Sequence, residues 1–280
     1  MHPIYIYIRQ ALSGHYPDTE ASALAKWILT EVFHFSAVDL YAGKDMNFST
    51  NETSKLEDIL TRLKRYEPLQ YILGQAFFCS LPFYVTSDVL IPRPETEELV
   101  EWITDDYAKK ERVRVLDIGT GSGCIPVALS KRLKKAEVFS WDVSEKALDI
   151  ARRNVLLNQV EVKLEQVDVL SGIYPRIKVD ILVSNPPYIA EKERKDMEPN
   201  VLDWEPGLAL FVPDDDPLVF YRRIGELGMD SLVEGGSLYY EINRAYGAET
   251  VRLLEDMGYE KVELRKDLSG NDRMIKAVRP

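Results

Sequence analysis

The chain has 280 residues, of which 45% are apolar and 29% charged, as expected of a soluble globular protein with one large domain or two unequal ones. Its formal net charge of -11 argues against a protein that holds nucleic acid mainly through phosphate contacts. The two cysteines and three histidines share no metal-ligand spacing, so the sequence predicts neither a disulfide framework nor a metal site. Because the sequence has neither a long apolar run nor an export signal, we expect a cytoplasmic protein that contacts no membrane.

Residues 1–73 show helical periodicity and are predicted to form a small helical domain. Apolar residues recur at intervals of three and four behind a cap at Asp18 or Thr19. They recur again in residues 56–63, behind a polar cluster at residues 51–54. These apolar stripes are most simply the core of the domain, and the alternative is a groove for a partner.

Residues 74–92 are predicted to form a β-hairpin that links two domains. Aromatic and β-branched residues become frequent there, and Pro82 interrupts the run, as expected of a short hairpin. Residues 91–97, Ile-Pro-Arg-Pro-Glu-Thr-Glu, then give an extended entry into a helix with an acidic first turn, which the helix dipole favours. These residues are either a helix start alone or part of the lining of a cofactor cleft.

Residues 93–280 are predicted to form an α/β domain with a seven-stranded, mostly parallel, Rossmann-like sheet, because strands and helices alternate. We expect strands at residues 113–118, 138–141, 160–164, 179–184, 237–242, 261–265 and 274–278, and helices at residues 122–133, 144–157, 217–232 and 248–257. A nicotinamide-binding Rossmann sheet has one strand fewer, so the count favours a methyltransferase sheet.

A glycine-rich turn, Gly-Thr-Gly-Ser-Gly at residues 119–123, follows the first of these strands. Its glycines let the backbone turn sharply and approach a ligand closely. A dinucleotide fingerprint would place its third glycine where Cys124 stands. The spacing therefore suits a nucleoside with an amino-acid tail better than a pyrophosphate.

Carboxylates end the next two strands. Asp142 lies at the end of the second strand, 19 residues after Gly123, where it can accept hydrogen bonds from both ribose hydroxyls. The alternative role for Asp142 is a helix cap, although Ser144 can cap the next helix unaided. Asp168 and Val169 follow the third strand and would lie beside an adenine ring.

The fourth strand ends at Asn-Pro-Pro-Tyr, residues 185–188. The prolines stiffen this loop and have no N–H, while the Asn185 side chain both accepts and donates hydrogen bonds. A planar amino group, such as a carboxamide or a base amine, could place its two N–H groups on the Asn185 side-chain oxygen and the Pro186 main-chain oxygen, with Tyr188 covering its face. Taken alone, the tetrapeptide is most simply a loop after a strand. The glycine-rich turn upstream favours a site.

Together these features match an S-adenosylmethionine site, and the chain resembles the release factor glutamine methyltransferases, the HemK/PrmC family. The resemblance runs through residues 67–74, 91–97, 117–123, 185–189, 205–210 and 267–273. Asn-Pro-Pro-Tyr alone is shared with adenine-modifying DNA methyltransferases, whereas the Ile-Pro-Arg-Pro-Glu-Thr-Glu element and the helical N-terminal domain are not. The chain departs from the family pattern at Pro126 and in the acidic loop at residues 211–216.

The resemblance implies methylation of the glutamine side-chain amide in the Gly-Gly-Gln motif of peptide chain release factors, with S-adenosyl-L-methionine as cofactor. The predicted cofactor-binding residues are Gly119, Thr120, Gly121, Ser122, Gly123, Asp142, Asp168, Val169 and Asn185. The predicted substrate-binding residues are Asn185, Pro186, Pro187 and Tyr188, of which Asn185, Pro186 and Tyr188 are the predicted catalytic residues.

The helical domain would dock the protein substrate, and we expect a monomer with no direct nucleic-acid contact. One alternative is an adenine-specific nucleic-acid methyltransferase, which would be expected to show a basic face and a target-recognition insert. The other alternative is a non-catalytic cofactor-binding module.

Overall fold

A computed structural model describes residues 2–42 and 48–280, so Met1 and residues 43–47 of the predicted helical domain lie outside the described residues. No helix within these described ranges is long and apolar enough to cross a membrane. The same ranges contain no cluster of three or more His, Cys, Asp or Glu side chains that could hold a metal ion.

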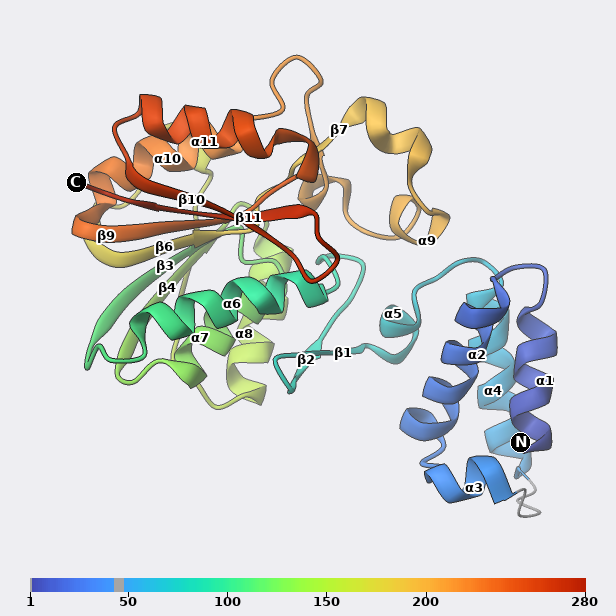
Figure 1. Ribbon diagram of the computed structural model, residues 1–280. Helices are drawn as coiled ribbons and strands as arrows, with labels where there is room; N and C mark the ends of the chain where they lie inside the picture. Colours follow the sequence, from blue (N-terminus) through green and yellow to red (C-terminus); the bar gives the residue numbers. More distant parts are fainter. Residues whose placement is uncertain (1, 43–47) are drawn as a thin grey trace. The chain divides into compact units, whose positions relative to one another are not determined.

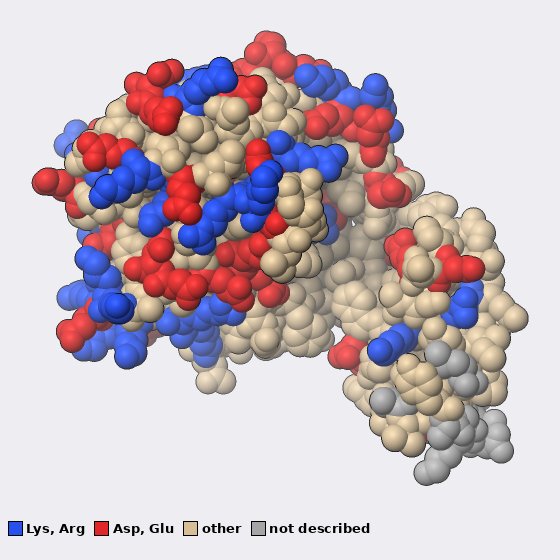
Figure 2. Space-filling view, in the orientation of Figure 1, with Lys and Arg blue, Asp and Glu red and all other residues tan. Residues whose placement is uncertain are grey.

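The chain divides into two compact units (Figure 1). The first contains the residues up to Leu73 together with Pro199–Trp204, and the second contains Gly74–Glu198 and Glu205–Pro280. In Figure 2, basic and acidic side chains are interspersed over the visible face of the second unit, whereas the first unit shows mainly uncharged side chains.

The first unit is helical. Its helices are α1 (Pro3–Leu12), α2 (Asp18–Trp27) with its π-helical continuation η1 (Ile28–Val32), α3 (Ala37–Ala42), α4 (Thr50–Leu63), α5 (Leu69–Leu73) and α9 (Pro199–Leu202). The predicted apolar stripes are buried against one another in a single core, to which α2 contributes Ala21 and Ala25 and α4 contributes Leu56, Ile59 and Leu60. The simpler interpretation of the stripes is therefore confirmed, since they form the unit's own core.

The helix caps of this unit differ from the prediction. Helix α2 begins at Asp18 with Pro17 at the N-cap position, so the predicted cap at Asp18 or Thr19 is wrong by one or two residues. Helix α4 is capped by Ser49, whose Oγ accepts from the Glu52 N–H while the Glu52 carboxylate accepts from the Ser49 N–H at 2.8 Å. This capping box satisfies two N–H groups of the first turn and places the polar cluster inside the helix.

The second unit starts with the predicted hairpin. Strands β1 (Gln75–Phe78) and β2 (Leu81–Tyr84) pair antiparallel. Cys79 and Ser80 form the turn between them with φ angles of 51° and 63°. Two consecutive positive φ angles are what a two-residue hairpin turn requires, and Asn-Gly or Asp-Gly is its usual sequence signal. Cys-Ser gives no such signal, so the hairpin was predictable from its strands but not from its turn.

The seven-stranded sheet is confirmed. Its strands are β3 (Val113–Ile118), β4 (Ala136–Asp142), β5 (Lys163–Gln166), β6 (Val179–Ser184), β9 (Leu232–Glu241), β10 (Glu260–Lys266) and β11 (Asp272–Val278). They lie in the order β10-β11-β9-β6-β3-β4-β5. Strand β11 is antiparallel to both of its neighbours, and the remaining pairs are parallel. A further short parallel pair, β7 (Ile189–Ala190) with β8 (Phe211–Val212), was not predicted.

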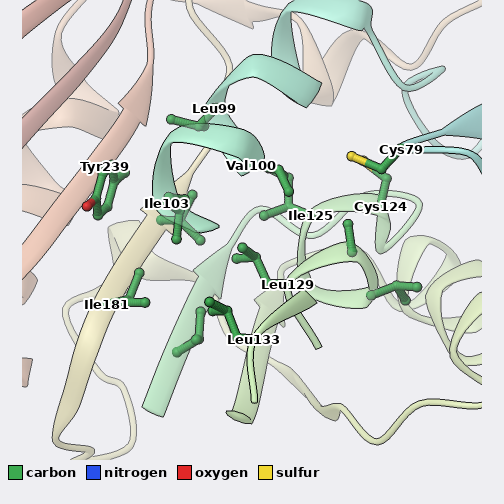
Figure 3. Close-up of a cluster of buried hydrophobic side chains, with 14 of the residues drawn as sticks. Cys79, Leu99, Val100, Ile103, Cys124, Ile125, Leu129, Leu133, Ile181 and Tyr239 are labelled. Carbon is green, nitrogen blue, oxygen red and sulfur yellow. The ribbon is translucent and has the colours of Figure 1, made fainter. Parts of the chain in front are cut away.

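Helices cover both faces of the sheet, as Figure 1 shows. Helices α6 (Pro94–Tyr107), α7 (Cys124–Arg132) and α8 (Glu145–Leu157) lie on one face, and α10 (Val219–Ser231) and α11 (Gly247–Asp256) lie on the other. In Figure 3, Leu99 and Ile103 of α6 and Leu129 of α7 lie in one cluster with Ile181 of β6 and Tyr239 of β9. Full burial of each such aliphatic side chain stabilises the fold by about 1.5–3 kcal/mol.

Pro126 is accommodated because it lies in the first turn of α7, where the main-chain N–H has no partner within the helix. Short 3₁₀ segments are formed by η2 (Val169–Ser171), η3 (Glu191–Asp196), η4 (Gly207–Ala209) and η5 (Arg244–Tyr246). Both η2 and η4 lie beside the pocket described next.

Candidate active site

The order of the strands places a pocket at the carboxyl end of β3. From β3 the chain proceeds to β4 and β5 on one side and to β6 and β9 on the other. Ligands of open α/β sheets bind where the strand order reverses in this way. The residues that line the pocket at this point include Thr96, Gly119, Thr120, Gly121, Ser122, Asp142, Asp168, Val169, Asn185, Pro186 and Pro187. The structure therefore brings together ten of the predicted site residues, while Gly123 and Tyr188 do not line the pocket.

Main-chain hydrogen bonds tie the glycine-rich turn to the end of β4. The N–H groups of Gly119 and Thr120 donate to the Trp141 carbonyl oxygen at 2.8 and 3.2 Å. Gly121 has a φ of +52°, and nothing lies within 4 Å of the position that a Cβ would take there. The turn therefore leaves open space above its backbone, as a close-fitting ligand requires.

The Asp142 carboxylate accepts a main-chain hydrogen bond on each oxygen. Gly121 N–H donates to Oδ2 at 2.9 Å, and Ser144 N–H donates to Oδ1 at 2.8 Å. Each oxygen keeps a lone pair for a further donor. Ser144 itself caps α8, since its Oγ accepts from the Ala147 N–H at 3.2 Å, so Asp142 is not needed as the cap. Burial raises the pKa of Asp142, and the main-chain donors oppose that shift.

Asp117 is a buried carboxyl group that the sequence analysis did not single out. Ser140 Oγ donates to its Oδ2 at 2.7 Å. Burial raises the pKa of Asp117 to about 7. Hydrogen bonds from the Ser140 and Thr120 side chains favour the charged form of Asp117 and so oppose the effect of its burial. The Asp142 carboxylate and the open backbone of the glycine-rich turn are the groups that the ribose hydroxyls and the amino-acid tail of S-adenosylmethionine need, so the residues present fit this cofactor.

The remaining predicted cofactor residues have local roles that the structure makes visible. A Cβ added to Gly123 would lie 3.2 Å from the Ala151 Cβ, so this glycine lets α7 approach α8 closely. Asp168 Oδ1 accepts from the Leu170 N–H at 2.9 Å and caps η2. Val169, the first residue of that segment, is buried and lines the pocket.

The Asn-Pro-Pro-Tyr loop presents acceptors beside the pocket. Asn185 Nδ2 donates to Thr96 Oγ1 at 3.3 Å. In the described part of the chain, no hydrogen-bond donor reaches Asn185 Oδ1 or the Pro186 main-chain oxygen. Both oxygens are therefore free to accept from a ligand, which is the arrangement that the sequence predicts.

Tyr188 points elsewhere. Its hydroxyl donates to Glu241 Oε1 at 3.2 Å, and its main-chain oxygen accepts from Asn243 Nδ2 at 3.0 Å. Burial raises the pKa of Tyr188. Because the ring does not line the pocket, its predicted part in covering a substrate stays a prediction.

The Ile-Pro-Arg-Pro-Glu-Thr-Glu element both starts a helix and lines the pocket, so the two interpretations of these residues are compatible. Pro94 is the first residue of α6, whereas Arg93 and Thr96 line the pocket. Arg93 Nη2 lies 2.5 Å from Oε1 of the buried Glu205. This ion pair joins the start of α6 to the segment before η4, which forms another wall of the pocket.

Carboxylates of the acidic loop after η4 accept hydrogen bonds from neighbouring helices. Asp216 accepts from both terminal nitrogens of Arg222 at 2.7 and 3.1 Å, and Asp214 accepts from the Lys192 N–H at 2.9 Å. These contacts hold the loop against η3 and α10. Two of the three aspartates of this loop, Asp214 and Asp216, therefore have structural partners.

The chain is similar to known methyltransferases in both of its predicted domains. The model described as "Methyltransferase small domain" matches residues 95–202, and the model described as "PrmC N-terminal domain" matches residues 4–74. A release factor glutamine methyltransferase of Bacteroides thetaiotaomicron is 50% identical over 281 aligned residues, which cover 100% of both chains. The chain belongs to the release factor glutamine methyltransferase family. The predicted family and enzyme class are confirmed.

A second member of this family, from Flavobacterium psychrophilum, is 46% identical over 95% of each chain. Among solved structures, a methyltransferase from Pyrococcus furiosus has a TM-score of 0.53 at 15% identity, covering 82% of this chain and 99% of that one. At that identity the likeness shows the fold alone, and it agrees with the predicted methyltransferase sheet.

Proposed function

We propose that this chain transfers a methyl group from S-adenosylmethionine to the side-chain amide nitrogen of the glutamine in the Gly-Gly-Gln motif of peptide chain release factors. The observation that carries the proposal is the pair of free acceptors, Asn185 Oδ1 and the Pro186 main-chain oxygen, beside a pocket at the sheet's switch point. Two acceptors on a stiff loop match the two N–H groups of a primary carboxamide. Membership of the family supports this choice of substrate.

The cofactor would be held by the predicted residues. The glycine-rich turn, residues 119–123, would follow its amino-acid tail, Asp142 would accept from the ribose hydroxyls, and Asp168 and Val169 would flank the adenine. S-adenosylmethionine supplies a methyl group that is already activated as an electrophile on its sulfonium.

The chain's contribution to the reaction is positioning and electrostatics. An amide nitrogen is a poor nucleophile because its lone pair is delocalised into its carbonyl. Asn185 Oδ1 and the Pro186 oxygen would accept from its two protons, hold it in line and stabilise the positive charge that develops on it. No ionisable side chain is then required as a base in the loop.

The domain assignment remains part of the proposal. Residues 1–73 would dock the release factor, residues 74–92 would link the domains, and residues 93–280 would bind the cofactor and transfer the methyl group. We place the reaction in the cytoplasm, where release factors act, and propose a monomer that binds neither nucleic acid nor membrane. The net charge of -11 and the mixed charges in Figure 2 support the absence of nucleic-acid contact.

The test is mass spectrometry of a purified release factor after incubation with the protein and S-adenosylmethionine. We expect one added methyl group on the glutamine of the Gly-Gly-Gln motif. A release factor in which that glutamine is replaced by glutamate is the matched control and should gain no mass. An unmodified glutamine in the natural factor would contradict the proposed function.

Replacing the acceptor side chain tests the role of the loop. Asn185→Ala should lower kcat by about 100-fold or more, because the lost hydrogen bond strengthens as charge develops on the nitrogen. Calorimetry should show a smaller change in S-adenosylmethionine affinity. A folded variant with nearly unchanged kcat would reduce Asn185 to an ordinary loop residue.

A further inference from the structure

A buried hydroxyl and a buried carboxyl lie behind Asn185. Thr96 Oγ1 donates to Glu241 Oε2 at 2.6 Å and accepts from Asn185 Nδ2 at 3.3 Å. Thr96 and Glu241 are each 1% exposed. Glu241 does not line the pocket. Its influence on a ligand there would therefore be indirect, through Thr96 and Asn185.

The topology brings these residues together from three elements. Thr96 lies in the first turn of α6, Asn185 follows β6, and Glu241 is the last residue of β9. Strands β6 and β9 are parallel, with Ser184 opposite Tyr240, so Asn185 and Glu241 follow at the same edge of the sheet.

Counting protons fixes the direction of the hydrogen bonds. A threonine hydroxyl has one proton, and at 2.6 Å that proton is committed to the Glu241 carboxylate. Thr96 can then only accept from Asn185, which requires the amide nitrogen of Asn185 to face it. The carbonyl oxygen of Asn185 must face the opposite way, toward the pocket.

Glu241 is held as an acceptor on both of its oxygens. Tyr188 donates to Oε1 while Thr96 donates to Oε2. Burial raises the pKa of Glu241, and the positive charge of Arg273 on the neighbouring strand β11 opposes that shift together with the two donors. Arg273 is itself anchored to Asp267 at 3.1 Å. The carboxylate therefore has two donors and a nearby positive charge to maintain it in a buried position.

We propose that Thr96 and Glu241 are positioning residues that lock the side-chain amide of Asn185 with its carbonyl oxygen turned toward the substrate nitrogen. An unlocked amide can rotate and present its NH₂ group, which repels the N–H groups of the substrate. The inference rests on the proposed function, and it adds to that function a reason why the Asn185 acceptor is available in one orientation only.

Removing the Thr96 hydroxyl tests the lock. Thr96→Val keeps the side-chain shape and should lower kcat for release-factor methylation by about 10-fold to 100-fold, since misplaced contacts cost about that much. S-adenosylmethionine affinity, measured by calorimetry, should stay within about twofold. Thr96→Ser keeps the hydroxyl and should restore most of kcat. Thr104→Val, the same change on the same helix at a hydroxyl that donates to the Val100 carbonyl oxygen, should leave kcat unchanged.

A double-mutant cycle separates positioning from a purely structural role. If Thr96 acts through Asn185, then Thr96→Val should change kcat by less than about twofold in an Asn185→Ala background, because the orientation to be locked is gone. An equal loss of kcat in both backgrounds would overturn the proposal, and so would a fully active Thr96→Val protein.

Glu241→Gln provides the same cycle if Thr96→Val does not fold. The amide that this change introduces can donate to Thr96, which frees the threonine proton for Asn185 and turns the Asn185 amide around. We expect the same loss of kcat in the wild-type background and the same absence of loss beside Asn185→Ala. A wild-type protein that methylates no release factor refutes the proposed function, whereas an active wild type with independent Thr96, Glu241 and Asn185 effects refutes the lock alone.

Discussion

Burial of the Asp117 carboxyl ties the stability of the fold to pH. Its pKa is raised to about 7 by burial, with the nearby Asp142 charge adding to the shift. The folded chain therefore binds this proton more tightly than the unfolded chain, in which the pKa is about 3.9. The stabilisation is fully present below about pH 4 and is lost as the pH rises to about 7. Above that pH, the folded protein holds a buried negative charge on β3.

Asp117→Asn should remove this pH dependence. Each pKa unit corresponds to about 1.4 kcal/mol. Between pH 5 and pH 8, the unfolding free energy of the wild type should therefore fall by about 3 kcal/mol relative to that of the variant. Urea unfolding of the ligand-free proteins at both pH values measures it. Parallel pH profiles for the two proteins would show that Asp117 does not titrate in this range.

The site residues that sequence analysis found are those that local pattern determines. The glycine-rich turn, Asp142 and the Asn-Pro-Pro-Tyr loop each follow a strand, and parallel strands end at one edge of a sheet. Thr96 and Glu241 are 145 residues apart, and only the strand order brings them into contact. Their pairing therefore had no signal in one sequence.

At the scale of elements, burial decided which boundaries could be predicted. The expected bounds of β3 and β6 match the structure, because both strands are mostly apolar and are buried on both faces. Strand β5 begins three residues later than expected, because it is a mostly exposed edge strand that lacks such a run. Strand β9 begins at Leu232, five residues earlier than expected, and runs through Gly235 and Gly236, which resemble a turn in sequence.

Gly236 lies where β9 approaches β6 closely. A Cβ there would lie 2.9 Å from the Val233 carbonyl oxygen and 3.1 Å from that of Asp180 on β6. The strands approach too closely for a side chain, so the glycine marks a close backbone contact within the sheet.

The Asn154 side chain of α8 binds the hairpin through the main-chain groups of β2, as a neighbouring strand would. Asn154 Oδ1 accepts from the Tyr84 N–H at 2.6 Å, and its Nδ2 donates to the Tyr84 carbonyl oxygen at 2.9 Å and to that of Ser122 at 2.8 Å. Asn154 is fully buried, and these bonds join β2, α8 and the glycine-rich turn. The amide satisfies both main-chain groups at the edge of β2 as a neighbouring strand would.

Asn154→Ala should lower the unfolding free energy by about 3 kcal/mol, because it leaves the buried Ser122 carbonyl oxygen and the part-buried main-chain groups of Tyr84 without these partners. The matched control is Asn158→Ala one turn later, where the side chain donates to the Pro82 and Asn154 carbonyl oxygens. We expect it to cost about 1 kcal/mol. Equal losses in urea unfolding would show that the two amides serve the hairpin equally.

At the scale of the whole molecule, we propose that the two units have different roles. Every residue that lines the pocket belongs to the second unit. The apolar stripes of the first unit are buried in its own core. A carboxamide pocket cannot distinguish one glutamine from another, so specificity has to come from surface away from the reacting nitrogen. The helical unit is our candidate for part of that surface.

A chain that begins at Gly74 tests this division. It should bind S-adenosylmethionine with an affinity within about threefold of wild type, because it keeps every lining residue. It should lose most of its kcat/KM toward an intact release factor, since remote contacts no longer hold the amide in line. Toward a short Gly-Gly-Gln peptide, it should be as active as the full-length chain. Calorimetry and methyl incorporation on one preparation measure these quantities.

Pro199–Trp204 requires a control, because it groups with the helices that such a chain lacks. Trp204 Nε1 donates to the Arg65 carbonyl oxygen at 3.1 Å, and Trp204→Ala in the full-length chain removes that contact while keeping the helices. If the helices dock the substrate, the full-length variant should retain activity on the intact factor that the shortened chain loses. Full activity of the shortened chain on the intact factor would leave the helices a role in folding or stability alone.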